Sequence, residues 1–160
     1  MLEIKGLFKS FGGVAAISDV NMTFTTGSLT AVIGPNGAGK STFFNLISGG
    51  LVPDAGEVIL DGRDLVGRTR AEIIRAGIGR AFQIAKIFPS LTVEETLLGA
   101  MSAHQGHSAH LVHRFPLPET RDKIVHVAEL LGLADKLPVL SANLSPADQI
   151  ALAIALALVL

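Results

Sequence analysis

Residues 34–42, which read GPNGAGKST, constrain this chain more than any other feature. They fit the pattern G-x-x-x-x-G-K-[ST] without a mismatch. An apolar, partly β-branched run at 29–33 precedes them and predicts a buried strand, and residues 41–47 predict a helix. A strand, a glycine-rich loop and a helix in this order form the context in which the pattern marks a phosphate-binding loop.

Each part of this loop has a chemical task. Its glycines let successive N–H groups converge on one anion, and the helix N-terminus adds roughly half a positive charge there. Lys40 is placed to reach the β- and γ-phosphates, and the Ser41 hydroxyl to complete a Mg²⁺ shell. The residues expected to bind the nucleotide are Gly34, Asn36, Gly37, Ala38, Gly39, Lys40, Ser41 and Thr42. The motif thus predicts nucleoside triphosphate binding, and a glycine turn that merely begins a helix is the alternative.

Composition narrows the class of protein further. The chain has 160 residues, a formal net charge of −1 and no cysteine. That length suits one domain with a full core, and the near-neutral charge gives no electrostatic reason to expect nucleic acid as a partner. Disulfide partners are excluded, no secretory leader is recognisable, and the apolar run at 150–160 is too short to cross a bilayer. We therefore expect a cytoplasmic protein.

The remaining strand signals lie mostly before residue 83. Residues 2–8, 20–24 and 57–60 predict strands of an antiparallel sheet, and Asp61 and Gly62 after the third predict a hairpin turn. Residues 78–82 predict one more strand, which ends at Gln83. Asp61 also resembles a Mg²⁺-binding aspartate at a strand end, but Asp-Gly is the commonest hairpin corner, so we interpret it as a turn residue.

Helix signals dominate the second half of the chain. Thr92 and Glu95 form a capping box that opens a helix to about Met101, and a second helix runs from Pro118 to a stop at Gly132. A shorter helix is expected at 70–76. The predicted fold class is α/β: a P-loop NTPase core with an antiparallel β subdomain and an inserted α-helical subdomain. The expected parts are 1–83 (β subdomain and P-loop core), 84–144 (helical subdomain) and 145–160 (a final helix).

His104, His107, His110 and His113 recur at every third position. Imidazole is a common zinc ligand, so a metal site is one interpretation. Residues spaced by three do not stay on one face of an α-helix, however, so the four imidazoles would not all point to one metal ion. Gly106 also disfavours a helix there. We favour a solvated loop and keep the metal site as the alternative.

A second helix start stands at residues 144–149. Ser145 suits the N-cap position, Pro146 the first helical position, and Asp148 the position of a capping carboxylate. We expect the first N–H groups and the Ser145 hydroxyl to point outward, as in an anion-binding end. A well-capped helix with no ligand is the alternative.

These features together resemble the nucleotide-binding domain of ABC transporters. Residues 144–149 are similar to the family's Leu-Ser-Gly-Gly-Gln signature. Phe11 matches the aromatic residue that stacks on adenine, and Gln83 the glutamine that touches Mg²⁺ and senses the transmembrane partner. Residues 34–49 and 79–83 look most like the subgroup that serves importers of branched-chain amino acids and related amides.

The resemblance implies a mechanism and partners. Two domains, from a homodimer or a paralogous ATPase, would bind head to tail with ATP and Mg²⁺ between them. The phosphate loop of one subunit and Ser145 and Ala147 of the other would enclose each ATP. Closure would move transmembrane permease subunits, which places the protein peripherally on the inner face of the membrane.

Two departures from the family pattern affect the signature. Pro146 and Ala147 replace its glycines, and the Ala147 methyl stands where backbone must approach the γ-phosphate. We hypothesise weaker closure over ATP; unchanged ATP-dependent dimerisation on Ala147→Gly in a complete protein would refute it. The following helix is apolar on all sides, which predicts burial all round.

The family's Walker B strand ending in Asp-Glu and its later switch histidine have no match in the 160 residues. Without a catalytic glutamate we expect little hydrolysis, weak MgATP binding and a fold incomplete at the C-terminus, and we leave enzymatic activity open. An inactive nucleotide-binding fragment, a non-transport ABC ATPase acting on DNA or ribosomes, and a nucleotide kinase or GTPase are the alternatives.

Overall fold

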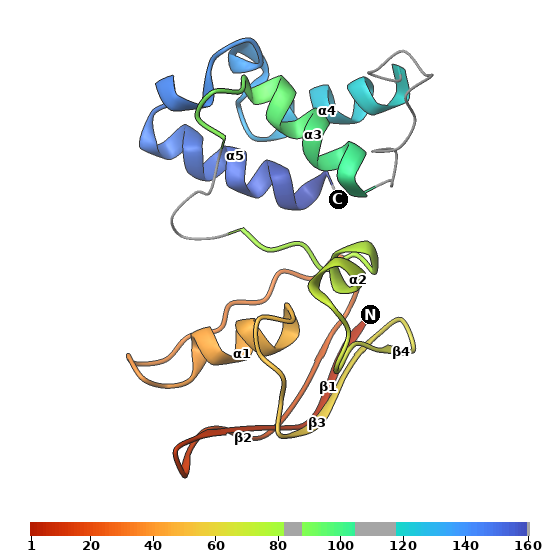
Figure 1. The fold of residues 1–160 in the computed structure, drawn as a ribbon, viewed down its shortest axis with the longest axis vertical. Helices are drawn as coiled ribbons and strands as arrows, with labels where there is room; N and C mark the ends of the chain where they lie inside the picture. The colour runs from red at the N-terminus through yellow and green to blue at the C-terminus, as the bar shows by residue number, and fades with distance from the viewer. Residues whose placement is uncertain (82–87, 105–117, 160) are drawn as a thin grey trace. The chain divides into compact units, whose positions relative to one another are not determined.

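The computed structural model describes residues 1–81, 88–104 and 118–159, which divide into the compact units Met1–Ile78 and Gly79–Leu160. Figure 1 shows both units, and each has its own hydrophobic core. The expected division at residues 83 and 144 stays a prediction, since residue 83 lies outside the described part of the chain.

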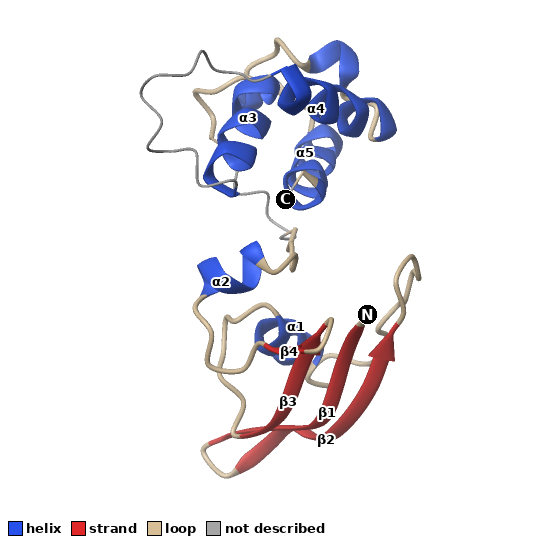
Figure 2. Cartoon of the chain, turned by 90° about the vertical axis from the view of Figure 1, so that its right-hand side faces the viewer, coloured by secondary structure: helices blue, strands red, loops and turns tan. Residues whose placement is uncertain are grey.

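The first unit contains a sheet of four antiparallel strands in the order β2-β1-β3-β4 (Figure 2). The strands are β1 (Leu2–Phe11), β2 (Val14–Phe24), β3 (Ala55–Leu60) and β4 (Arg63–Asp64). The predicted antiparallel sheet is therefore confirmed. The first two strands are longer than expected because they pair up to the turn between Phe11 and Val14.

The turn between β3 and β4 confirms the interpretation of Asp61. Asp61 and Gly62 both have positive φ, 47° and 79°, as a tight hairpin turn requires. The Asp61 carboxylate accepts a hydrogen bond from the N-terminal ammonium of Met1 at 2.5 Å. Asp61 is thus a turn residue that also holds the beginning of β1.

Helix α1 (Lys40–Ile47) covers the core of this unit. Its buried Phe43, Leu46 and Ile47 belong to the same cluster as Leu7 of β1 and Val58 of β3. Helix α2 (Arg70–Arg75) adds Ile73 to that cluster and begins with a capping box at Thr69. This capping box was not predicted from the sequence, although Thr69 and Glu72 have the spacing that it requires.

The strands expected at 29–33 and 78–82 are wrong for the residues that the structure describes. Residues 29–33 and 78–81 have no strand conformation, and Leu29 and Ile33 are 102% and 89% exposed. A strand is defined by its ladder of inter-strand hydrogen bonds, and no described segment pairs with either run. Residues 29–33 have the apolar, partly β-branched composition of a strand, but neither segment has a neighbouring strand to pair with among the described residues.

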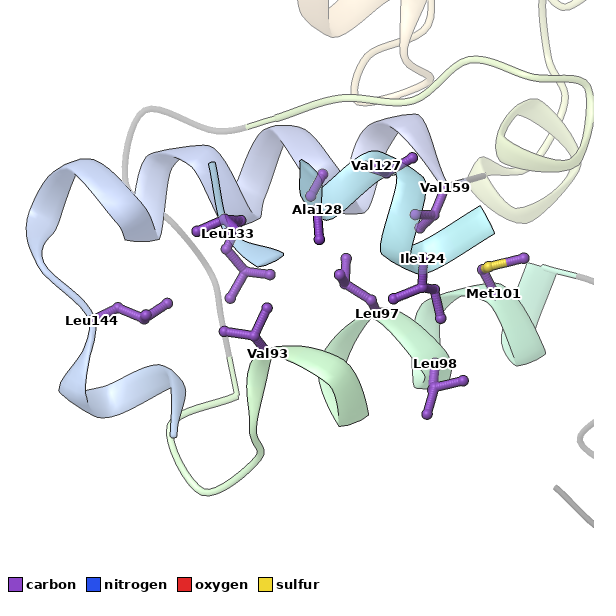
Figure 3. Packing of buried hydrophobic residues seen from close by; sticks show 12 residues of the cluster. Val93, Leu97, Leu98, Met101, Ile124, Val127, Ala128, Leu133, Leu144 and Val159 are labelled. Carbon is purple, nitrogen blue, oxygen red and sulfur yellow. The ribbon is translucent and has the colours of Figure 1, made fainter. Parts of the chain in front are cut away.

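The second unit is built from three helices that pack against one another: α3 (Val93–His104), α4 (Pro118–Leu130) and α5 (Pro146–Leu158). Figure 3 shows side chains from all three gathering in one apolar cluster, with Leu97 and Ile124 fully buried. Two short 3-10 segments, η2 (Ala134–Lys136) and η3 (Ser141–Asn143), connect α4 to α5.

The capping box predicted for α3 is confirmed. The Thr92 N–H donates to the Glu95 carboxylate at 2.8 Å, and the Glu95 N–H donates to the Thr92 hydroxyl at 3.2 Å. Inside the unit the hydroxyls of Thr96 and Ser141 are hydrogen-bonded at 3.3 Å, which ties α3 to η3. The predicted stop of the next helix at Gly132 is also confirmed, because this glycine has φ +67°.

The expectation that α5 is buried on every side is wrong. Leu152, Ala155 and the following Val159 are buried in the helical cluster. Ile150, at 51% exposure, and Leu158, at 53%, lie on the other side. Helix α5 is apolar all round, but the described residues cover only one of its faces.

Candidate nucleotide-binding site

The start of α1 is an open helix end. Gly39 occupies the N-cap position in the left-handed region, with φ 82° and ψ 2°. It provides no side-chain cap, and the first turn contains no acidic residue. The N–H groups of a first helical turn have no partners inside the helix, so this end offers them to an external acceptor.

Glycine is required at position 39 for two reasons. A left-handed backbone is strained for a residue with a Cβ, and a Cβ placed there would collide with the carbonyl oxygen of Ala16 in β2. It would also lie 3.0 Å from Cδ1 of Ile17. The loop is therefore pressed onto β2 at this point, and the sheet fixes its position.

A concave pocket of about 250 Å³ lies in front of this helix end. Its lining residues are Ala16, Asn36, Gly37, Ala38, Gly39, Lys40, Ser41 and Thr42. All the predicted loop residues except Gly34 are among them. Gly34 does not line the pocket, but its carbonyl oxygen accepts a hydrogen bond from the ammonium of Lys40, which does.

The backbone amides of the loop are largely open. The Ala38 N–H donates to the Pro35 carbonyl at 3.2 Å, and helical bonding begins with the Phe43 N–H and the Gly39 carbonyl at 2.8 Å. Within the described part of the chain, the N–H groups of Gly39 and Lys40 meet no acceptor. The loop thus presents unpaired donors to its pocket, as a polyphosphate site needs.

Lys40 folds back across the loop. Its ammonium donates to the carbonyl oxygens of Gly34 at 2.6 Å and Pro35 at 2.7 Å. An ammonium has three donors, so these bonds leave one for a further acceptor in the pocket. The positive charge is therefore held against the backbone of the loop.

Phe11, the residue expected to stack on a base, ends β1 and is 47% exposed. It pairs with Val14 across the hairpin, whose second strand also supplies Ala16 to the pocket. Gln83 lies outside the described residues, as do His107, His110, His113 and the side chain of His104. In the described part of the chain, no three His, Cys, Asp or Glu side chains come close enough to hold a metal ion.

The predicted N-cap of α5 is confirmed, and the Ser145 hydroxyl takes part in hydrogen bonds of the helix start itself. The Asp148 N–H donates to the Ser145 hydroxyl oxygen at 3.2 Å, and that hydroxyl donates to the Asp148 carboxylate at 2.7 Å. The Lys136 ammonium donates to the other carboxylate oxygen at 2.7 Å. The bonds from Lys136 and then Ser145 lower the pKa of Asp148 below its ordinary value. Ser145 and Ala147 are exposed, yet this helix end already holds an anion of its own.

A glycine loop with open amides, a helix start and a lysine across the loop define the P-loop class of phosphate-binding sites. Beyond this class, the sequence profile of the family described as "ABC transporter" matches residues 17–160. The chain belongs to this family. Its fold is the ABC ATPase fold, as the resemblance in the sequence implied.

Curated relatives include branched-chain amino acid transport proteins. LivG of Escherichia coli K12, a high-affinity branched-chain amino acid transport ATP-binding protein, is 34% identical over 97% of this chain and 63% of its own length. The probable LivG of Archaeoglobus fulgidus is 41% identical over 71% of this chain and 43% of its own length. The chain thus spans less than two thirds of the length of these relatives.

A solved structure with the same fold is the ADP conformation of MJ1267, an ATP-binding cassette of an ABC transporter. It has a TM-score of 0.80 and 30% identity over 99% of this chain and 64% of that one. The dimeric structure of the bacterial cassette MJ0796 has a TM-score of 0.73 and 25% identity over 98% of this chain and 69% of that one.

Proposed function

We propose that this chain binds MgATP through residues 34–42, as the ATP-binding subunit of an importer for branched-chain amino acids or related amides. The observation that carries the proposal is the pocket at the start of α1, which is lined by Lys40 and by Gly39, whose N–H groups meet no acceptor in the described part of the chain. The names of the E. coli and A. fulgidus relatives support the choice of cargo.

The remaining expected contacts belong to the same proposal. Phe11 would stack on the adenine, and Ser41 and Gln83 would hold Mg²⁺. Ser41 fits this role, because it is exposed and lines the pocket. The metal would supply positive charge between the β- and γ-phosphates. Ser145 and Ala147 would approach the γ-phosphate of ATP bound to a second subunit.

The proposed partners are a second ATPase subunit, identical or paralogous, and transmembrane permease subunits. The dimer of MJ0796 supports the first of these. No helix in the described residues has the length and hydrophobicity to cross a lipid bilayer. The proposed location, on the cytoplasmic face of the membrane beside a permease, follows from family membership.

Nucleotide binding is tested by titrating the purified chain with ATP and with tripolyphosphate, with Mg²⁺ and with EDTA. Lys40→Met removes the charge that lies across the loop and should weaken both ligands at least tenfold, since it removes a charged contact to phosphate. Lys5→Met is the matched control, because Lys5 lies in the same unit and pairs with Glu3 on the surface. Equal binding by Lys40→Met and the unaltered chain would refute the proposed site.

The cargo is tested in cells of the source organism. Disrupting the gene should lower the uptake of radiolabelled leucine, isoleucine and valine and leave ribose uptake unchanged. The opposite pattern, or unchanged uptake of every amino acid, would contradict the branched-chain assignment. Association of the tagged chain with ribosomes or DNA instead of membranes would favour a non-transport ATPase.

A further inference from the structure

Lys9, Phe11 and Asp54 form a cluster beside the turn between β1 and β2. The Lys9 ammonium donates to the Asp54 carboxylate at 2.6 Å and lies 5.6 Å from the centre of the Phe11 ring. The Lys9 side chain is only 17% exposed, whereas Phe11 remains 47% exposed. A largely covered lysine side chain, paired with Asp54, therefore lies beside an aromatic ring that is open to solvent.

Asp54 is the anchor of this cluster. Its second carboxylate oxygen accepts hydrogen bonds from the N–H of Ser10 at 2.8 Å and from the Ser10 hydroxyl at 3.1 Å. Its own N–H donates to the carbonyl of Phe8 at 3.0 Å. The Lys9 bond and then the Ser10 N–H hold the pKa of Asp54 below its ordinary value. The carboxylate is thus ionised at neutral pH and fastened to β1 at several points.

The Lys9 ammonium lies over the Phe11 ring near the end of β1, where the pairing with β2 shifts register between Lys9 and Ser10. The ring carries negative charge on its faces, so the ammonium attracts one face and restrains the ring. Phe11 is not one of the residues that form or pack against the buried core of its unit. The Asp54 carboxylate holds the ammonium, and the ammonium in turn holds the ring.

The hairpin that carries the ring also supports the phosphate loop. Phe11 is paired with Val14, and two residues further along β2 the carbonyl of Ala16 touches Gly39 and lines the pocket. A ring with a fixed orientation on this hairpin offers a base a prepared surface. Restraining it before the nucleotide arrives removes the cost of immobilising it during binding.

We propose that Lys9, held by Asp54, is a positioning residue that orients Phe11 for stacking with the base of the bound nucleotide. This inference rests on the proposed function and adds residues that determine base affinity. Lys9 acts on the ring and touches neither the phosphates nor the metal.

The test compares ATP, which has a base, with tripolyphosphate, which has none, by calorimetry on the intact chain. Lys9→Met keeps the aliphatic stem and removes the charge. It should weaken ATP binding roughly two- to fivefold, as expected for the loss of a cation–π contact, and leave tripolyphosphate binding unchanged. Lys9→Arg keeps the charge and should bind ATP as tightly as the unaltered chain. Asp54→Asn should weaken the binding of ATP and not that of tripolyphosphate, because it releases Lys9. In a Phe11→Leu background, Lys9→Met should have no further effect.

Several outcomes would overturn the inference. An equal loss of ATP and tripolyphosphate affinity would make Lys9 a phosphate contact. Unchanged ATP binding by Lys9→Met, or a loss in Lys9→Arg as large as in Lys9→Met, would exclude a role in orienting the ring. If the unaltered chain binds tripolyphosphate as tightly as ATP, the inference fails and the phosphate loop stands. If the unaltered chain binds neither ATP nor tripolyphosphate, both the inference and the proposed function fail.

Discussion

The starts of α1 and α5 are both exposed helix N-termini, but their backbone donors have different partners. At α1 the cap is Gly39, with no side-chain bond and no acidic residue in the first turn. At α5 the cap is Ser145, which exchanges hydrogen bonds with the carboxylate of Asp148. A helix start needs an anion or polar acceptor, and of these two helices α5 carries its own. The residue at the N-cap therefore determines whether the N–H groups of a helix start remain available to a ligand.

Charge reinforces this difference. Among the described residues, Lys40 near α1 is hydrogen-bonded only to neutral carbonyls, and one donor remains for the pocket. The lysine near α5, Lys136, is paired with Asp148. A phosphate approaching α5 would meet a carboxylate, whereas one approaching α1 would meet a free positive charge. We therefore expect α1 to bind phosphate much more strongly than α5.

The largest effect is expected from Gly39→Ala. The new methyl would be held in a left-handed backbone against the Ala16 carbonyl, so the loop must move away from β2. Strain of this kind costs about 1–3 kcal/mol, so nucleotide affinity should fall by about tenfold or more in a titration with ATP.

Gly67→Ala is the matched control for this change. Gly67 also has a positive φ, 76°, but no atom lies within 4 Å of the added Cβ. It should lower the melting temperature through backbone strain and leave ATP affinity unchanged. Equal affinities for ATP in both variants would show that the contact between the loop and β2 does not shape the α1 site.

A smaller effect is expected from Ser145→Ala. It removes the side-chain cap of α5 and should destabilise the chain by about 1 kcal/mol in urea denaturation. ATP binding to the isolated chain should not change, because Ser145 is not among the residues of the α1 pocket. A weakened affinity for ATP with unchanged stability would reverse the comparison and make α5 the ligand-binding end.

Local rules predicted much of this fold. The capping box of Thr92 and Glu95, the turn at Asp61 and Gly62 and the cap at Ser145 each depend on residues within one turn of chain. The phosphate loop is local in the same sense, because its glycines, lysine and helix start are consecutive. For these features the sequence contains all the interacting groups.

Features that depend on distant partners were predicted less well. Residues 29–33 have a strand composition, but a strand needs a neighbour, and composition does not supply one. Helix α5 was expected to be buried all round, yet Ile154 is 38% exposed, because an apolar face does not specify what packs on it. The bond between Lys9 and Asp54 was missed because 45 residues separate the partners. The position of Lys9, two residues before Phe11 on one strand, was the available signal.

The smallest effect is expected from titrating Asp148. Its pKa is lowered in the folded chain, so it contributes stability above the ordinary aspartate pKa of about 4 and loses it as the pH falls through the folded value. Asp148→Asn removes the charge and keeps most of the shape. The variant should melt below the unaltered chain at pH 7, and the difference in melting temperature should shrink towards pH 3.

Comparing the two chains at each pH removes the contributions of Asp54 and Glu72, whose pKa values are also lowered and which both chains share. A difference in melting temperature that stays constant from pH 7 to pH 3 would mean that the charge of Asp148 does not stabilise α5. In that case the start of α5 would not be satisfied by its own carboxylate, and the contrast with the open end of α1 would rest on the Ser145 cap alone.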